Sequence, residues 1–374
     1  MISIQKGGFA SGTLDFVRFF AALAVLLGHG VSRFFGPYNP SDSPSVFEKI
    51  FRVLMSGYGS HGVTIFFVLS GLFIGYSVLN QVKRSAFSWK SYLGRRLIRL
   101  WIVLIPALIL TAVLDFLGLY YFYSDAIYSN GDVIGAIDGS NNSLADFFGN
   151  VFFLQTILVP TFGTNGALWS LANEFWYYVL FPLAIFTFIT KDNIQKSVCF
   201  AVLFVSLCFF IGAEITLSFS VWLLGVAVLF IPANNVFRIK HAVIYSLAGL
   251  LISLVALRIA PEFDNKLIER SLVSIPFILF VITVIANDRV LAGGSRYLSI
   301  SNKMAGFSYT IYLVHTPILC LIRGWLIGDS QYWEFNILNV FSFFIIVSFI
   351  LWIAYFIAQL TEVHTSKLYR LLKI

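Results

Sequence analysis

Charged residues are scarce in this 374-residue sequence. Asp, Glu, Lys and Arg together make up 11% of it, whereas a typical soluble domain contains about 25%. A soluble chain of this length could not cover its surface with so few charges, so the composition excludes a soluble enzyme, a nucleic-acid-binding module and a disordered segment. Hydrophobic residues make up 59%, and Phe alone occurs 40 times. The sequence therefore predicts an all-α, polytopic membrane protein embedded in a lipid bilayer.

Cysteine is also rare. The three cysteines, Cys199, Cys208 and Cys320, all lie in apolar segments and do not have the spacing of a metal site. We expect them to be buried thiols, and we expect no metal. We find no repeat of fixed period in the sequence.

Ten long apolar segments dominate the chain, and each is close to the 20 or so residues that a spanning helix needs. The first could be mistaken for a signal peptide, but it lacks a clear cleavage site and carries Asp15 and Arg18, so we interpret it as a retained helix. We expect one membrane domain over residues 1–374, with no extracytoplasmic domain after the last span. The predicted spans are 13–32, 58–79, 97–118, 168–190, 196–213, 216–232, 241–259, 271–287, 304–326 and 336–360.

The basic residues separate cleanly between the two faces that these spans define. One face carries seventeen basic residues against three acidic ones, whereas the other carries seven basic and thirteen acidic residues. The positive-inside rule then places both termini in the cytoplasm and the protein in the inner (cytoplasmic) membrane. The net charge of +7 is therefore a signal of topology. The seventeen are Lys6, Lys83, Arg84, Lys90, Arg95, Arg96, Arg99, Lys191, Lys196, Arg238, Lys240, Arg289, Arg296, Lys303, Lys367, Arg370 and Lys373.

The longest loop, at about 119–167, is predicted to lie on the outer face. It is polar and rich in Asn, Gly and Asp, and loops of this length are often functional. It ends in a short apolar run, Val151 to Val159, which is too short to span and which we predict to be a re-entrant or surface helix.

A few ionisable residues lie within the spans, where charge is costly and marks functional interiors. Asp15 and Arg18 are one turn apart and can pair, either as a structural anchor or as part of a site. His29 is predicted in the outer part of the membrane, and Glu174 enters from outside to a depth of roughly 9 Å. The similar depth permits a carboxylate–imidazole pair. His315, in the ninth span, is predicted to have a supporting or structural role.

Arg96 and Arg99 lie three apart at the inner mouth of the third span. They serve either as positive-inside anchors or as a guanidinium pair that clamps a phosphate. Several aromatic residues lie near the interfaces and could stack on sugar rings or anchor the helices in the bilayer. These are Trp169, Tyr177, Tyr178, Tyr309 and Tyr312.

These residues fall in five segments that, in this order, resemble the type 3 membrane acyltransferase family, whose members O-acylate cell-surface glycans. Each segment alone is a weak signal, but five in order across most of the chain are specific. The segments are Leu14-Asp-Phe-Val-Arg18 followed by His29, Gly62 to Gly71, Arg96-x-x-Arg99, Trp169-Ser-Leu-x-x-Glu174 with Tyr177 and Tyr178, and Gly306 to His315.

The resemblance implies an acyl donor, acetyl-coenzyme A, taken from the cytoplasm, and an acceptor hydroxyl on a cell-surface or lipid-linked glycan. His29 matches the family's essential histidine, and Arg96 and Arg99 match its basic pair. We predict that His29 acts as general base, that Glu174 orients it, and that the two arginines hold the coenzyme phosphates. A covalent acyl-enzyme carried by Ser170 or by His29 stays open.

Two other classes of protein compete with this interpretation. A proton-coupled transporter or flippase would also contain buried Asp, Arg, His and Glu, but many carriers consist of two related halves, and the sequence contains no such symmetry. A glycan polymerase would share the large outer loop, but it would not need a phosphate clamp in the cytoplasm. The sequence does not identify the acceptor sugar, the acyl chain or the oligomeric state.

Overall fold

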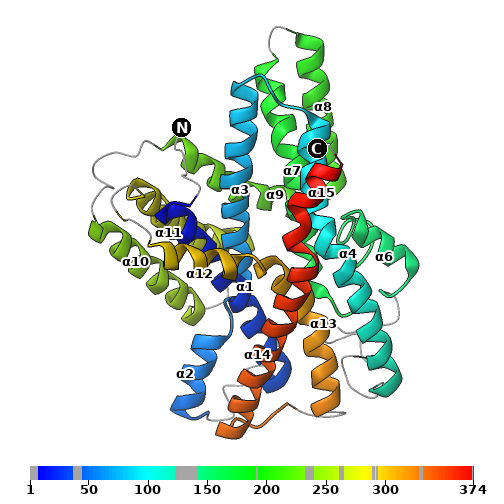
Figure 1. Ribbon diagram of the computed structural model, residues 1–374, viewed down its shortest axis with the longest axis vertical. Coiled ribbons are helices and arrows are strands. Elements are labelled where there is room, and N and C mark those ends of the chain that lie inside the picture. The colour runs from blue at the N-terminus through cyan, green and yellow to red at the C-terminus, as the bar shows by residue number, and fades with distance from the viewer. Residues whose placement is uncertain are drawn as a thin grey trace.

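The computed structural model describes residues 7–36, 44–122, 128, 141–190, 193–231, 240–260, 265–288, 291, 294–327, 332–372 and 374. Within these ranges the chain is mostly helical, and they contain no β-strand (Figure 1). The helices are α1 (Phe9–Phe35), α2 (Val46–Met55), α3 (Gly59–Lys83), α4 (Trp89–Tyr121), α6 (Leu144–Val151), α7 (Trp169–Ile189), α8 (Ile194–Ile211), α9 (Ala213–Ala227), α10 (Lys240–Ile259), α11 (Lys266–Ala286), α12 (Ser295–Ala305), α13 (Ser308–Leu326), α14 (Ile337–Leu360) and α15 (Thr365–Leu371). Short 3-10 turns lie at Gly166–Leu168, Val228–Phe230 and Glu362–His364.

The ten predicted spans are confirmed, because ten stretches of helix in the described residues are long and apolar enough to cross a membrane. The two spans with the shortest connection are separate helices, α8 and α9, and the chain turns between them at Gly212, which has a positive φ of 83°. Glycine adopts this conformation without the strain that a Cβ would impose. The orientation of the helices relative to the cytoplasm stays a prediction.

The apolar run Val151 to Val159 is not the helix that the sequence suggested. Helix α6 ends at Val151, and the run continues as tight turns closed by a bridge between Gln155 and Val159. Phe153 and Thr156 have positive φ values of 60° and 66°, which an α-helix does not allow. Packing outweighs the helical preference here, since the Phe153 ring stacks on Phe175 of α7 with centroids 4.3 Å apart. Of the remaining outer loop, residues 123–127 and 129–140 lie outside the described residues.

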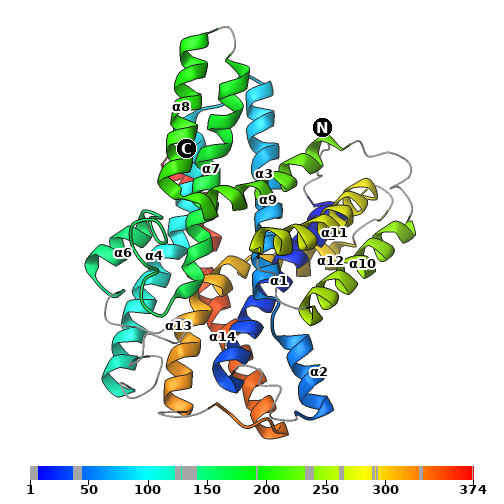
Figure 2. The same cartoon turned by 180° about the vertical axis from the view of Figure 1, so that it is seen from behind.

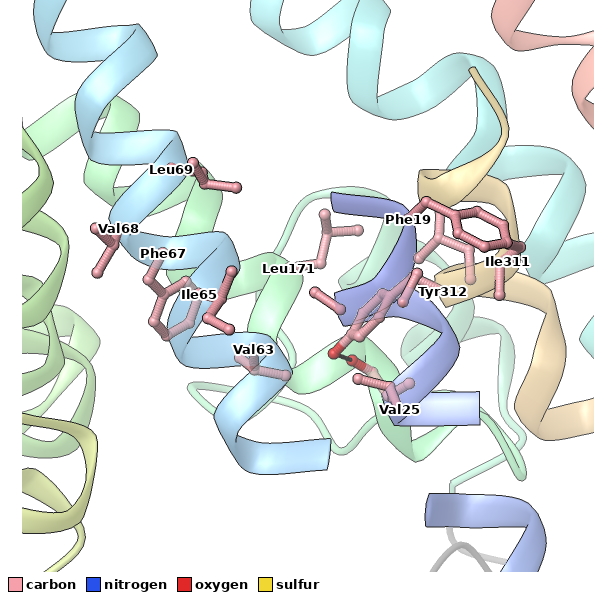
Figure 3. Packing of buried hydrophobic residues seen from close by; sticks show 14 of the residues in the cluster. Phe19, Val25, Val63, Ile65, Phe67, Val68, Leu69, Leu171, Ile311 and Tyr312 are labelled. Carbon is pink, nitrogen blue, oxygen red and sulfur yellow. Dashed lines mark hydrogen bonds between the residues drawn. The ribbon is translucent and has the colours of Figure 1, made fainter. Parts of the chain in front are cut away.

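Helix α1 runs through the middle of the bundle and packs against α3, α12 and α13, while α4 packs against α13 on the other side (Figures 1 and 2). Figure 3 shows side chains of α1, α3, α7 and α13 meeting in one apolar core, among them Phe19, Val63, Leu171 and Ile311. The site described below lies among these helices and α4. The C-terminal helix α15 lies against α4, where the Tyr369 hydroxyl donates to the Arg95 carbonyl at 2.9 Å.

Helices α3 and α9 approach each other backbone to backbone at two glycines. A Cβ on Gly71 would overlap the carbonyl oxygen of Trp222, and one on Gly225 would overlap the carbonyl oxygen of Val68. Small residues allow this kind of close packing in membranes, where apolar burial alone does not draw helices together.

Replacing Gly71 with alanine should therefore destabilise the protein, by about 1–3 kcal/mol, because the added methyl group must push two helix backbones apart. The matched control is Gly249→Ala, since a Cβ at Gly249 of α10 meets no atom within 4 Å. The measurement is the apparent melting temperature of each purified variant in detergent. Equal melting temperatures for the two variants would contradict the close approach of α3 and α9.

Prolines interrupt four of the spanning helices, and each leaves the carbonyl four residues earlier without its helical N–H partner. At three of these positions a side chain from another part of the chain supplies the missing donor. This is needed because the interior of a bilayer contains no water that could donate to the carbonyl. The three bonds are Tyr92 Oη to the Tyr178 carbonyl (3.0 Å, for Pro182), Ser253 Oγ to the Leu272 carbonyl (3.4 Å, for Pro276) and Asn165 Nδ2 to the Leu313 carbonyl (2.8 Å, for Pro317).

Candidate active site

A pocket opens among α1, α3, α4, α7 and α13, and its wall is mixed in character. One side is apolar and comes mainly from α3, including Phe66, Phe67 and Phe73. The other side carries most of the polar groups, from α1, α4, α7 and α13. The polar lining residues are Arg18, Ser70, Arg96, Arg99, Ser170, Glu174, Tyr178, Ser308, Tyr309 and Tyr312.

Three guanidinium groups meet in this pocket. Arg96 and Arg99 come from one face of α4, and Arg18 comes from α1. Arg18 pairs with Asp15 at 3.5 Å and lies over the ring of Phe73, 4.5 Å from its centroid. Among the described residues, Glu174 is the single carboxylate in the pocket wall, which carries an excess of positive charge. Such a cluster is suited to bind a phosphate-bearing anion.

The Nε atom of Arg96 is buried and has no hydrogen-bond partner among the described residues. The Arg96 guanidinium lies near the Tyr92 ring, 5.8 Å from its centroid, and this contact does not satisfy the Nε–H donor. Leaving a buried donor of a charged group unpaired costs roughly 1–3 kcal/mol or more. An acceptor oxygen of a bound ligand would remove that cost. Arg99, one turn further along α4, is exposed at the pocket wall.

Glu174 faces the arginines and not His29. Its carboxylate accepts a short hydrogen bond from the hydroxyl of Tyr178, one turn later on α7, and it interacts electrostatically with Arg18 and Arg99. The carboxylate–imidazole pair between Glu174 and His29 that the matched depths suggested is therefore wrong. Depth along a helix does not determine the direction of a side chain, and the rotation of α7 turns Glu174 into the pocket.

The partner of His29 is His315, which the sequence assigned only a supporting role. Nδ1 of His29 lies 2.9 Å from Nε2 of His315, and the two rings stack with centroids 5.1 Å apart. His315 is completely buried in α13, whereas His29 is half-buried. We name these two residues the histidine pair. Helix α1 contacts α13 along its length, and this contact brings together residues 286 positions apart.

The histidine pair adjoins the pocket but does not line it. Tyr312 lines the pocket, and His315 lies one turn further along α13, about 4.5 Å along the axis. The hydroxyl of Tyr312 donates to the Ala167 carbonyl at 2.9 Å, so its oxygen accepts from Ser170 at 2.6 Å. Along α1, Arg18 in the pocket and His29 are eleven residues or about 16 Å apart.

A buried polar contact fixes the loop that leads into α7. Asp115 of α4 is fully buried and accepts from the backbone N–H of Thr164 at 2.9 Å and from its hydroxyl at 2.6 Å. Gly163 has a positive φ of 55° and lies directly against the same carboxylate, which leaves no room for a side chain. Because this loop continues into Ser170 and Glu174, the Asp115 contact determines where they enter the pocket.

The remaining predicted site residues lie close to the pocket but do not line it. Trp169 faces away, with the Arg270 guanidinium 5.6 Å from its ring centroid. Asp15 reaches the pocket only through Arg18.

The sequence did not single out Asp115, and it placed Glu362 in the set of cytoplasmic charges. In the structure Glu362 accepts from the Thr310 hydroxyl at 2.8 Å and interacts electrostatically with Arg99. Neither residue carries a motif that would have revealed these contacts.

Fold and site together define a multi-pass membrane protein with an internal arginine-rich pocket and an adjacent histidine pair. A family model described as an acyltransferase domain matches residues 12–359. The chain belongs to this family, the type 3 membrane O-acyltransferases, and is a membrane acyltransferase. No match was found among curated proteins or among solved structures.

Proposed function

We propose that this acyltransferase takes an acetyl group from acetyl-coenzyme A at the cytoplasmic side and transfers it to a hydroxyl of a cell-surface or lipid-linked glycan. The observation that carries the proposal is the arginine-rich pocket, in which the buried Nε of Arg96 lacks a partner among the described residues. The phosphates of a coenzyme would supply both the missing acceptor and the counter-charge.

The spacing of the site supports this donor. Arg18 of the arginine cluster and His29 of the histidine pair are about 16 Å apart along α1, a distance comparable to the extended pantetheine arm of the coenzyme. With its phosphates on Arg96 and Arg99, the coenzyme would direct its thioester past Ser170 and Tyr312 toward His29. Holding donor and acceptor together away from water would supply the orientation that acyl transfer needs.

His29 is proposed as the general base. It takes the proton of the acceptor hydroxyl while that oxygen forms its bond to the acetyl carbonyl carbon. The carbon–sulfur bond then breaks and the proton passes to the sulfur, which leaves an O-acetyl ester and the free coenzyme thiol. Ser170 is less suited to carry the acyl group, because its hydroxyl donates to Tyr312 and has no base among its described hydrogen bonds.

In this proposal Glu174 belongs to the part of the site that binds the acyl donor. Together with Tyr178 it would hold Arg18 and Arg99 in position around the coenzyme, since it interacts with both guanidinium groups. Its proposed role thus moves from orienting the base to ordering the phosphate site.

Loss of the gene should remove one acetyl group, a mass of about 42 Da, from a surface glycan, and complementation should restore it. The measurement is mass spectrometry of surface glycans from the deletion strain, the complemented strain and a strain complemented with a His29→Ala variant. The position of the lost group would identify the acceptor hydroxyl. An identical mass profile in the deletion and complemented strains would refute transfer to a surface glycan.

A further inference from the structure

The two rings of the histidine pair share one hydrogen bond, and only one of the facing nitrogens can carry the proton. These atoms are Nδ1 of His29 and Nε2 of His315, 2.9 Å apart. A neutral imidazole has one N–H donor and one acceptor nitrogen. The tautomer of one ring therefore determines the tautomer of the other.

The other nitrogen of His315 determines which ring donates. Its Nδ1 lies 3.0 Å from the backbone carbonyl oxygen of Ile311, one turn earlier on α13. A carbonyl oxygen can only accept, so Nδ1 of His315 carries the proton. In a neutral ring, Nε2 is then the acceptor, and it can receive from Nδ1–H of His29 and from the nearby Thr316 hydroxyl at 3.1 Å.

The surroundings favour the neutral form of His315. The ring is completely buried, and no carboxylate appears among its described hydrogen bonds. A positive charge lies close by, since the buried Arg33 side chain donates to the His29 carbonyl at 3.4 Å and interacts electrostatically with both imidazoles. A second buried cation beside Arg33 would be repelled and poorly solvated.

We propose that His315 is a positioning residue that holds His29 as the Nδ1–H tautomer, so that the Nε2 lone pair of His29 points away from the pair and is free to act as a base. This inference rests on the proposed function of His29 and adds how the base is prepared. No described hydrogen bond uses Nε2 of His29, and the ring is half-buried, so a substrate can reach that atom. Free histidine prefers the opposite tautomer, in which Nε2 carries the proton and cannot accept one.

The same bond would act during transfer. When Nε2 of His29 receives the hydroxyl proton, the ring becomes positively charged. Its Nδ1–H then donates more strongly to the neutral His315 acceptor, because a charge-assisted hydrogen bond is stronger than a neutral one. His315 thus accepts from the protonated base, as a carboxylate does beside a catalytic histidine elsewhere, but it stays neutral itself.

Two substitutions of His315 separate positioning from a purely structural role. His315→Asn can keep a donor near the Ile311 carbonyl, but it lacks an acceptor at the position of Nε2. His315→Gln extends its amide to the position of Nε2 and can offer its oxygen to His29. We expect the Asn variant to lose about 10²-fold in kcat, part of the 10²–10⁴-fold that a general base contributes. The Gln variant should retain kcat within about tenfold, and KM for acetyl-coenzyme A should be unchanged in both.

The tautomer itself can be measured without any acyl transfer. The chain has five histidines, so ¹⁵N-histidine spectra of the purified protein in detergent can be assigned by single substitutions. The expected result is an Nδ1–H signal for His29 in the unmodified protein and an Nε2–H signal in His315→Asn. An Nε2–H tautomer for His29 in the unmodified protein would overturn the inference, and so would equal kcat in His315→Asn and the unmodified protein.

The two measurements also distinguish the proposals from each other. If His29 shows the Nδ1–H tautomer but His29→Ala retains acyl transfer, the proposed base is wrong while the assigned proton position stands. If His29→Ala is inactive and the tautomer is Nε2–H, His29 is still required for transfer, while the positioning role of His315 is wrong. Equal loss of kcat and of melting temperature in both His315 variants would make His315 a structural residue only.

Discussion

Replacing His29 with alanine should lower the rate of acyl transfer by at least about 10²–10⁴-fold, the contribution that a general base typically makes. The variant removes Nε2 of His29. In the described contacts this is the only nitrogen of the histidine pair without a hydrogen-bond partner, so it is the one free to receive a proton from a substrate. Expression and membrane insertion should be unchanged, because His29 is half-buried and its side-chain bond is to His315 alone in the described residues. The measurement is transfer of labelled acetyl groups by purified protein or membrane vesicles.

His241→Ala provides the matched control for this prediction. His241 lies at the start of α10, exposed and away from the pocket, so the same substitution there should leave the rate unchanged. Binding of labelled acetyl-coenzyme A to His29→Ala should also be retained, since His29 does not line the pocket that contains the arginine cluster. Transfer at more than about one tenth of the normal rate would exclude His29 as the base.

The double substitution Arg96→Ala with Arg99→Ala should weaken acetyl-coenzyme A binding by about 10²-fold or more. Each charge-assisted hydrogen bond to a phosphate contributes roughly 1.5–3 kcal/mol, and 1.4 kcal/mol is a factor of ten in affinity. The fully saturated rate should fall less than the affinity, because in the proposed function these side chains hold the donor and do not touch the reacting carbonyl. Equilibrium binding of labelled coenzyme to purified protein measures the effect directly.

Arg95 offers a control within the same stretch of α4. Its side chain is exposed and does not line the pocket, while its backbone carbonyl accepts from Tyr369 and is retained in any variant. Arg95→Ala removes a positive charge from the same stretch of α4 without removing one from the pocket, so it should lower affinity little. An equal loss of binding in Arg95→Ala and in Arg96→Ala or Arg99→Ala would contradict a specific phosphate site. Unchanged binding in the double variant would show that Arg96 and Arg99 act only as topological anchors.

The membrane fold could be predicted from the sequence because each span carries its own signal. A run of about 20 apolar residues needs no information from the rest of the chain to identify it as spanning. The exception is the run Val151 to Val159, whose conformation depends on a distant partner. The stacking of Phe153 on Phe175 and the two positive φ angles have no local signal in an apolar run.

Part of the candidate site could likewise be predicted from the sequence, and part of it could not. The resemblance pointed to His29, Arg96 and Arg99, and the structure places both arginines in one pocket. The histidine pair joins residues 286 positions apart, and the sequence gives no information on how α1 and α13 are rotated against each other. For that reason the sequence analysis paired His29 with Glu174, which lies at a similar depth, and not with His315.

The proline-freed carbonyls have a consequence for how this chain can change. Each proline and the side chain that donates to its freed carbonyl depend on each other during evolution. Asn165 has to donate to the Leu313 carbonyl only because Pro317 has no N–H that could do so. Losing Asn165 alone strands a carbonyl in the bilayer, whereas losing Pro317 first restores the helical bond and makes the amide dispensable. The order of the two changes therefore decides whether the path passes through an unstable protein. Leu313 precedes His315 by two residues, so the order of these two substitutions also limits how the sequence can change close to the histidine pair.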